Sequence, residues 1–178
     1  MGRYIGPVEK LERREGVSLD LKGKRQLRGK TALERRGPQP PGQHGAARRR
    51  APSVYGQQLR EAQKLKIAYG IRERQMRRLV ERARRNRETA AGEALLQMLE
   101  RRLDIPSAAI ADGSWIRIAP GAPVADLARE AAEDIGLIPA WLVVDHEALA
   151  GKVLRAPERS EIATPVSEQL GIERYARR

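Results

Sequence analysis

The chain has 178 residues, enough for one ordinary domain or two small ones, and 35 lysines and arginines against 23 acidic residues give it a formal charge of +12. Such an excess favours a polyanionic partner, nucleic acid first, through long-range attraction and counterion release. The absence of cysteine excludes disulfides, thiol nucleophiles and thiolate metal sites, and two distant histidines offer little to a metal ion. No apolar stretch or signal sequence indicates a membrane protein, so we expect an intracellular chain without a membrane partner.

The positive charge is concentrated in the first part of the chain. Residues 1–104 hold 27 lysines and arginines against 12 acids, whereas residues 105–178 hold 8 against 11. A change of sign along a chain indicates that one part binds the polyanion and the other serves another role. We therefore expect a basic N-terminal arm and Pro/Gly-rich loop over 1–52, a helical domain over 53–104, and a separate segment over 105–178.

Residues 1–52 are predicted to contain little regular structure. A short helix is expected over 10–15 and is ended by Gly16, because basic clusters alternate with glycines on either side. Pro38, Pro40 and Pro41 then exclude helix and strand, since each fixes φ and lacks an amide donor. This stretch is predicted to be an ordered loop or an extended arm.

Three amphipathic helices are predicted next. The first is capped by Ser53 and runs to Tyr69, before Gly70; the second spans about 72–87; the third spans 91–104. The second helix has a thin apolar stripe surrounded by arginines. The third carries its leucines on one side, which is typical of a bundle core.

Short strands and one helix are predicted after residue 104. "SWIRIAPG" alternates like an exposed strand, "PVADLAREAAEDIG" reads as a capped helix, and "AWLVVD" and "GKVLRAP" read as two further strands. The fold class is therefore α+β: a basic, mainly helical N-terminal domain followed by a small, truncated α/β domain with short strands and a C-terminal helix.

Basic residues in the loop and on the second helix are the candidate RNA contacts. Rigid prolines reduce the entropy cost of ordering the loop, and Gly42 and Gly45 let the backbone approach a phosphate closely. The alternative is that such runs are only solvated, and for Lys10, Arg13 and Arg14 the interspersed acids leave a self-neutralising surface open. On the second helix almost all charges have one sign, which favours a polyanion over mere solubility.

Base stacking and catalysis have little support in the sequence. Aromatic residues are 3% of the chain, so recognition is expected to rest on phosphate contacts, and Trp115 and Trp141 are expected in the core or an interface. Asp145, His146 and Glu147 are adjacent and point in different directions, so they do not form a catalytic cluster. We expect no enzyme activity.

Several stretches taken together resemble the S-four family of bacterial small-subunit ribosomal proteins. "GRYIGPVEKLERREG", "PPGQHG", "YGQQLREAQKLKIAYGIRERQMRR", "LLQMLERRLD", "PAWLVVD", "LRAPERSEI" and "ERYARR" occur in the family's order over nearly the whole chain. The resemblance implies a ribosomal, cytoplasmic protein that binds the 5′ domain of small-subunit rRNA and nucleates assembly of the body. It also implies the neighbours S-five and S-three, a basic loop near the mRNA tunnel, and an influence on translational accuracy.

The residues expected to contact RNA are polar or basic and lie before residue 79. They are Arg3, Lys10, Arg13, Arg14, Lys22, Lys24, Arg25, Arg35, Arg36, Gln43, His44, Arg48, Arg49, Arg50, Arg60, Lys64, Lys66, Arg72, Arg74, Arg77 and Arg78. No catalytic residue, metal or cofactor is expected.

The chain departs from the family pattern in two places. Some members carry four zinc-binding cysteines where this chain has Glu9, Glu12, Gln26 and Thr31, so it resembles the cysteine-free branch and the arm is expected to be mobile in the free protein. The compact RNA-binding module that normally follows Asp104 is also absent, which leaves "SWIRIAPG" as a strand without its usual partner. Either the gene encodes a contracted protein, or this sequence omits a segment.

Two other functions stay open. A contracted family member could act as a free regulatory RNA-binding protein that represses an operon mRNA. An RNA-processing enzyme that uses His44 or the Asp145–Glu147 cluster is the more distant alternative.

Overall fold

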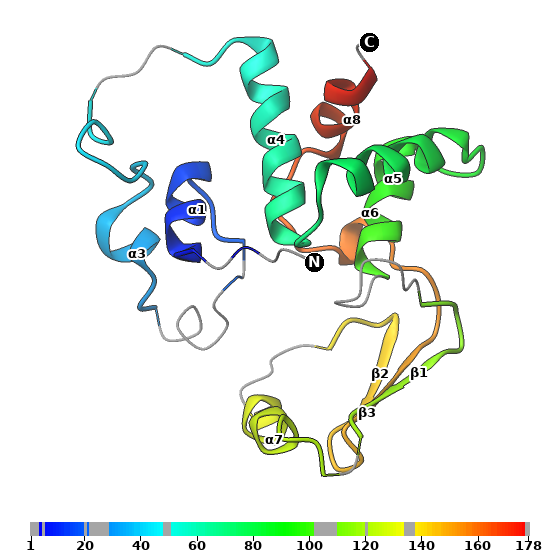
Figure 1. The fold of residues 1–178 in the computed structure, drawn as a ribbon. Coiled ribbons are helices and arrows are strands. Elements are labelled where there is room, and N and C mark those ends of the chain that lie inside the picture. Colours follow the sequence, from blue (N-terminus) through cyan, green and yellow to red (C-terminus); the bar gives the residue numbers. More distant parts are fainter. Residues whose placement is uncertain are drawn as a thin grey trace. The chain divides into compact units, whose positions relative to one another are not determined.

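The computed structural model of the chain describes residues 4, 6–19, 21, 29–47, 51–101, 110–119, 121–133 and 138–176 (Figure 1). The chain forms two compact units. Residues 1–95 and 163–178 make up one, which we call the helical unit, and residues 96–162 make up the other, the sheet unit.

The helical unit is built from short and medium helices. They are α1 (Val8–Glu15), α3 (Ala32–Arg36), α4 (Val54–Ala68), α5 (Glu73–Arg85) and α8 (Glu168–Ala176), while α6 (Ala91–Glu100) begins in this unit and ends in the other. The apolar residues of α4 and α5 form the core, where Leu65, Met76 and Ala83 are each fully buried.

Local signals explain where these helices begin and end. Gly16 adopts φ 73°, and its amide donates to Glu12 O at 2.8 Å, so α1 ends there as predicted. Ser53 Oγ accepts from Gly56 N at 3.2 Å and caps α4, also as predicted. The five-residue α3 was not predicted, although Thr31 and Glu34 form the capping box that starts it.

The last helix of the chain completes the helical unit. Helix α8 packs along α4 so closely that a Cβ at Gly171 would lie 2.8 Å from Leu65 Cδ1. Gln58 Nε2 on α4 also donates to Glu173 Oε2 on α8 at 2.9 Å. The expected segment 105–178 is therefore shared between the two units, because the apolar face of α8 is buried against α4.

The sheet unit contains β1 (Trp115–Arg117), β2 (Leu142–Asp145) and β3 (Ala150–Val153), with helix α7 (Ala125–Glu133) and the 3-10 turn η1 (Arg159–Glu161). The strands are antiparallel in the order β1-β3-β2, with Trp115 opposite Lys152 and Val143 opposite the same lysine. Helices and a small antiparallel sheet together confirm the predicted α+β class.

Three details add to the sequence-based expectation. Strand β1 pairs with β3, from 33 residues or more further along the chain, whereas the partner expected to be missing belongs to the absent module. Trp141 is buried, but Trp115 is 62% exposed and is not a core residue. Helix α6 ends at Glu100, and residues 102–104 of the predicted helix lie outside the described residues.

Candidate nucleic-acid interface

Helix α5 presents a stripe of arginines opposite its buried side. Met76, Leu79, Val80 and Ala83 are buried, so the helix faces the core along one narrow stripe. At 100° per residue the opposite side carries a second stripe, which we call the free arginine stripe. Its members are exposed and have no hydrogen-bond or ion-pair partner among the described residues: Arg74, Arg78, Arg82 and Arg85.

The free arginine stripe includes more residues than those expected from the sequence to contact RNA. Arg74 and Arg78 are among the residues expected to contact RNA, whereas Arg82 and Arg85 are not. The helical period that places Arg78 four residues after Arg74 also places Arg82 and Arg85 on that side. The stripe covers about 16 Å along the helix axis, at 1.5 Å per residue. It offers guanidinium groups, which suit bidentate contact with phosphates.

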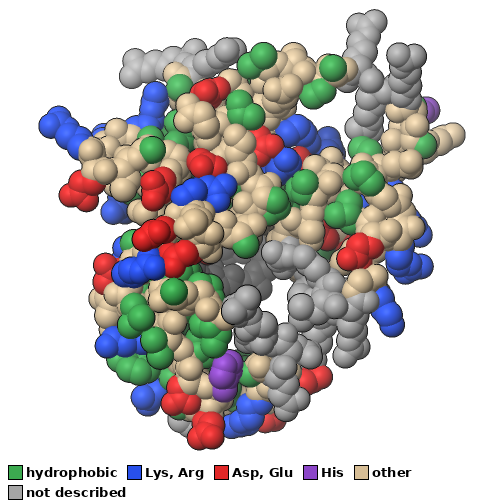
Figure 2. All heavy atoms as spheres, turned by 180° about the vertical axis from the view of Figure 1, so that it is seen from behind, with side chains coloured by type: hydrophobic (Ala, Val, Ile, Leu, Met, Phe, Trp, Pro, Cys, Tyr) green, Lys and Arg blue, Asp and Glu red, His purple; other side chains and the backbone are tan. Residues whose placement is uncertain are grey.

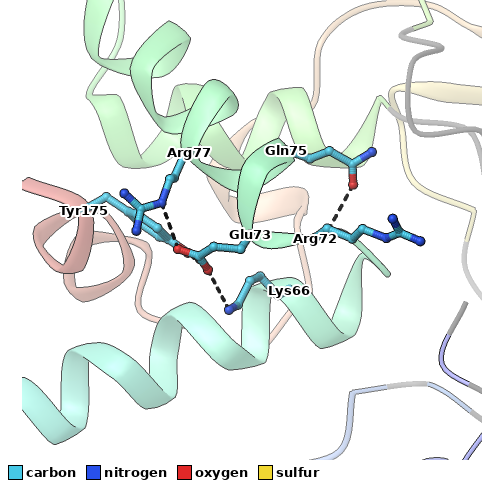
Figure 3. A network of polar contacts seen from close by, with 6 residues as sticks. All are labelled: Lys66, Arg72, Glu73, Gln75, Arg77 and Tyr175. Carbon is cyan, nitrogen blue, oxygen red and sulfur yellow. Dashed lines mark hydrogen bonds and ion pairs between the residues drawn. The ribbon is translucent and has the colours of Figure 1, made fainter. Parts of the chain in front are cut away.

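Glu73 forms ion pairs with two other basic residues of the helical unit. Its Oε2 lies 2.9 Å from Lys66 Nζ, and its Oε1 lies 3.1 Å from Arg77 Nε (Figure 3). Tyr175 OH on α8 donates to Glu73 Oε2 at 3.0 Å, and the Arg77 guanidinium lies 5.8 Å from the centre of the Tyr175 ring. One carboxylate thus joins α4, α5 and α8.

The electrostatics of this cluster follow from its contacts. Burial alone raises the pKa of Glu73, but the hydrogen bonds from Lys66, Tyr175 and Arg77 outweigh it and leave the pKa below its ordinary value. Burial and the neighbouring Glu73 carboxylate raise the pKa of Tyr175 well above its ordinary value. Tyr175 therefore stays protonated and remains a donor to Glu73.

Two further expected contacts are also engaged inside the helical unit. Arg60 Nη1 lies 3.0 Å from Glu15 Oε1, which joins α4 to α1. Lys64 Nζ lies 2.7 Å from Glu61 Oε1, and the other oxygen of Glu61 accepts from Ser167 N at 2.9 Å. Each of these expected contacts is paired with an acid of the helical unit, and the free arginine stripe lies outside these pairs: Arg60, Lys64, Lys66 and Arg77.

The carboxylate of Glu15 is buried, and its ionised form is unfavourable there. Burial raises its pKa above the ordinary value of 4.5, and the charges of Arg60, Lys64 and Arg14 offset this only in part. Glu12 is buried as well, and its Oε1 accepts from the backbone amides of Leu19 and Leu21 at 3.2 and 3.4 Å. Glu12 and Glu15 are thus used for folding, but the Glu15 carboxylate still interacts with Arg14, so the alternative of a self-neutralising surface around Lys10, Arg13 and Arg14 stays open.

The proline-rich loop is a compact series of turns. Gly45 N donates to Gly42 O at 3.0 Å and Ala47 N donates to His44 O at 3.2 Å. A Cβ at Gly45 would lie 1.9 Å from Pro40 O, so only glycine fits there. Gln43 and His44 are exposed at the same turn, where they can contact a ligand from an ordered backbone.

The other expected contacts divide between exposed positions and positions that the structure does not describe. Lys10 and Arg14 on α1, Arg35 and Arg36 at the end of α3, and Arg72 before α5 are exposed, while Arg13 is half-buried. The remaining ones lie outside the described residues: Arg3, Lys22, Lys24, Arg25, Arg48, Arg49 and Arg50.

Other classes of site find little support. Among the described residues no group of three or more histidine, cysteine, aspartate or glutamate side chains could hold a metal ion. Asp145 Oδ1 accepts from the amides of Glu147 and Ala148 at 3.0 and 2.9 Å, so it stabilises the turn between β2 and β3. Within the described part of the chain, no helix is long and apolar enough to span a membrane.

Comparison with known families decides which proteins the chain is related to. The model of the family described as "Ribosomal protein S4/S9 N-terminal domain" matches residues 3–100, more than half of the chain. The chain belongs to the ribosomal S-four family. Its matched range contains the free arginine stripe, the proline-rich loop and all of the Glu73 cluster except Tyr175.

Curated members of the S-four family match nearly the whole chain. "Small ribosomal subunit protein uS4" from two strains of Thermus thermophilus is 41% identical over 211 residues, which cover 99% of this chain and 100% of the relative. "Small ribosomal subunit protein uS4A" from Symbiobacterium thermophilum is 42% identical over 210 residues with the same coverage.

The same alignments show that this sequence lacks internal positions that its relatives have. Because the alignment with the Thermus protein is 211 residues long and this chain has 178, at least 33 aligned positions have no residue here. The relative is covered from end to end, so the missing positions lie within the chain.

Proposed function

We propose that this protein is a structural constituent of the small ribosomal subunit and binds its rRNA through the helical unit. The observation that carries the proposal is the 41% identity to "Small ribosomal subunit protein uS4" over 99% of the chain. The free arginine stripe supplies the physical means, since guanidinium groups that have no carboxylate partner can each contact a phosphate. The function is that of a cytoplasmic binding protein and not of an enzyme.

We infer further that the rRNA contact lies in the 5′ domain and that binding nucleates assembly of the body of the subunit. The exposed residues Arg74 and Arg78 are the central contacts, with Arg35 and Arg36 at the end of α3 as additional ones. Gln43 and His44 on the proline-rich loop then meet rRNA or mRNA near the mRNA tunnel. Protein contacts with S-five and S-three, and an influence on translational accuracy, complete this proposal.

The test is binding of the full chain to a 5′-domain rRNA fragment and to an unrelated structured RNA over a series of salt concentrations. We expect tighter binding to the 5′-domain fragment, with log affinity falling by about 0.7–0.9 per phosphate contact for each unit of log salt concentration. Equal and weak binding to both RNAs would refute the proposal. A nearly flat salt dependence would refute the phosphate-contact mechanism.

A free regulatory RNA-binding protein is the second candidate, because at least 33 aligned positions of the ribosomal relatives are absent here. The two functions differ in where the protein resides in the cell. Cofractionation of the protein with small ribosomal subunits at physiological salt supports the ribosomal role. Its absence from the subunits, with binding to an operon mRNA leader, supports the regulatory role.

A further inference from the structure

Exposed side chains lie on both faces of the three-stranded sheet, and one of these faces combines an aromatic ring with cations. Trp115 on β1, Lys152 on β3 and Val143 on β2 lie directly opposite one another in the antiparallel register, so their side chains share a face. Arg117 follows Trp115 by two residues and lies on the same face. Trp115 is 62% exposed and Val143 is 47% exposed, and Figure 2 shows hydrophobic side chains gathered at the surface over these strands.

This face is cationic in a unit that is otherwise acidic. Residues 96–162 contain 7 lysines and arginines against 11 acids. On the Trp115 face, however, Lys152 Nζ lies 5.7 Å from the centre of the Trp115 ring, and Arg117 is exposed on the same strand as Trp115. Neither cation has a carboxylate partner among the described residues. Asp145, the acid at the same level of the sheet as Arg117, directs an oxygen to backbone amides.

We propose that Trp115 stacks on an unpaired RNA base while Lys152 and Arg117 contact the adjoining phosphates. An exposed aromatic ring on a sheet, flanked by cations, is the arrangement by which single-stranded RNA is bound: the ring stacks on a base and the cations follow the backbone. The inference rests on the proposed function for the kind of RNA but adds a site outside the helical unit. It also differs from the sequence-based expectation that recognition rests on phosphate contacts and that base stacking has little support.

Composition favours RNA over a protein as the occupant of this face. The buried centres of protein interfaces are depleted in charged residues, including lysine, whereas here Lys152 lies in the middle strand between Trp115 and Val143. An RNA ligand uses that central cation as a phosphate contact and stacks on the face of the Trp115 ring that Lys152 does not cover. The pairing of positive charge with an aromatic ring therefore matches a nucleic acid better than an apolar protein surface.

The experiment compares Trp115→Ala and Trp115→Phe in the full chain. The probes are a single-stranded RNA of about eight mixed nucleotides and the 5′-domain rRNA fragment. We expect Trp115→Ala to weaken binding of the single-stranded probe about five- to 150-fold, the range typical of one lost base stack, and Trp115→Phe to retain most of the affinity. Tryptophan fluorescence of the wild type should be quenched by the short RNA, and Trp115→Phe, which keeps only the buried Trp141, should not be quenched.

The outcomes separate this inference from the proposed function. One outcome refutes the stacking site and leaves the ribosomal role standing. In this outcome the wild type binds the rRNA fragment, Trp115→Ala binds each RNA as tightly as the wild type does, and the short RNA causes no quenching. If the short RNA quenches Trp115 but the rRNA fragment binds no better than an unrelated RNA, the stacking site stands and the ribosomal role fails. If the wild type is a dimer by light scattering and Trp115→Ala is a monomer, the face joins two copies of the chain and the inference is overturned. Because Trp115 is largely exposed, circular dichroism should show an unchanged fold for both variants.

Discussion

Arg77 and Arg78 are neighbours on α5, and the structure predicts opposite results for the same substitution. Arg78 belongs to the free arginine stripe, whereas Arg77 donates to Glu73 Oε1 at 3.1 Å and lies over the Tyr175 ring. Arg78→Gln and Arg77→Gln each remove one positive charge from the same turn of the same helix. Any effect of net charge is therefore matched, and the difference between the two variants reports direct phosphate contact.

The magnitude follows from counterion release. One lost phosphate contact reduces the slope of log affinity against log salt concentration by about 0.7–0.9. Between 50 and 200 mM salt, the affinity of Arg78→Gln for the 5′-domain fragment should accordingly fall about threefold less than that of the wild type. We expect Arg77→Gln to leave the slope nearly unchanged, because Glu73 already holds that guanidinium.

The assay is a filter-binding or anisotropy titration of each protein at four or more salt concentrations, with circular dichroism to verify that both variants stay folded. Equal changes of slope in the two variants, or a larger change in Arg77→Gln, would refute the division into free and internally paired arginines.

Three further predictions concern the folding of the helical unit. Gly45→Ala should open the proline-rich loop, since the added Cβ would lie 1.9 Å from Pro40 O, and limited proteolysis should cut the variant within residues 37–47 much faster than the wild type. Glu73→Gln should lower the free energy of unfolding by about 1–2 kcal/mol at pH 7, as expected for three partly exposed contacts. Folding lowers the pKa of Glu73, so the stability difference between wild type and Glu73→Gln is present above the ordinary pKa of 4.5. It disappears as the pH falls below the pKa of Glu73 in the folded protein. Urea unfolding of both proteins at pH 7 and about pH 3 measures this change. For Glu15 the effect on stability has the opposite sign, because its raised pKa means that the ionised carboxylate is unfavourable in the folded protein. Glu15→Gln should therefore unfold at the same or a higher urea concentration than the wild type at pH 7. Arg60→Gln, which removes the partner of Glu15, is the destabilised comparison.

Helices with strong local signals could be predicted from the sequence, and short elements could not. Ser53 and Gly16 mark helix ends by side-chain capping and left-handed backbone, which are properties of a few neighbouring residues. The start of α3 at Thr31 carries a similar signal, but the helix has only five residues and no apolar period of its own. Its existence depends on packing against α1, which periodicity does not report.

The basic residues of the candidate site could be predicted from the sequence, but the ion pairs that some of them form could not. The arginines of α5 were visible as a basic helix, and the 3.6-residue period would have placed Arg82 and Arg85 beside Arg78. No local pattern indicates that Arg77 is held by Glu73 and Tyr175, because Tyr175 lies 102 residues from Glu73 in sequence. Trp115 lies on a strand that the sequence indicated to be exposed, but its side chain was expected in the core or an interface, because alternation does not say whether either face of a strand is covered.

The discontinuity of the helical unit has a consequence for the order in which the protein is synthesised. Residues 1–95 leave the ribosome first, but α8 packs on α4 only after the intervening residues 96–162 have been translated. At 5–20 residues per second this delay is about 3–13 s, during which the apolar side of α4 around Leu65 lacks its cover. The nascent chain thus carries its free arginines before the scaffold that orients them is closed. An RNA or a chaperone that meets the chain in this interval encounters a partly open helical unit, and the final helix sets the moment at which that unit becomes complete.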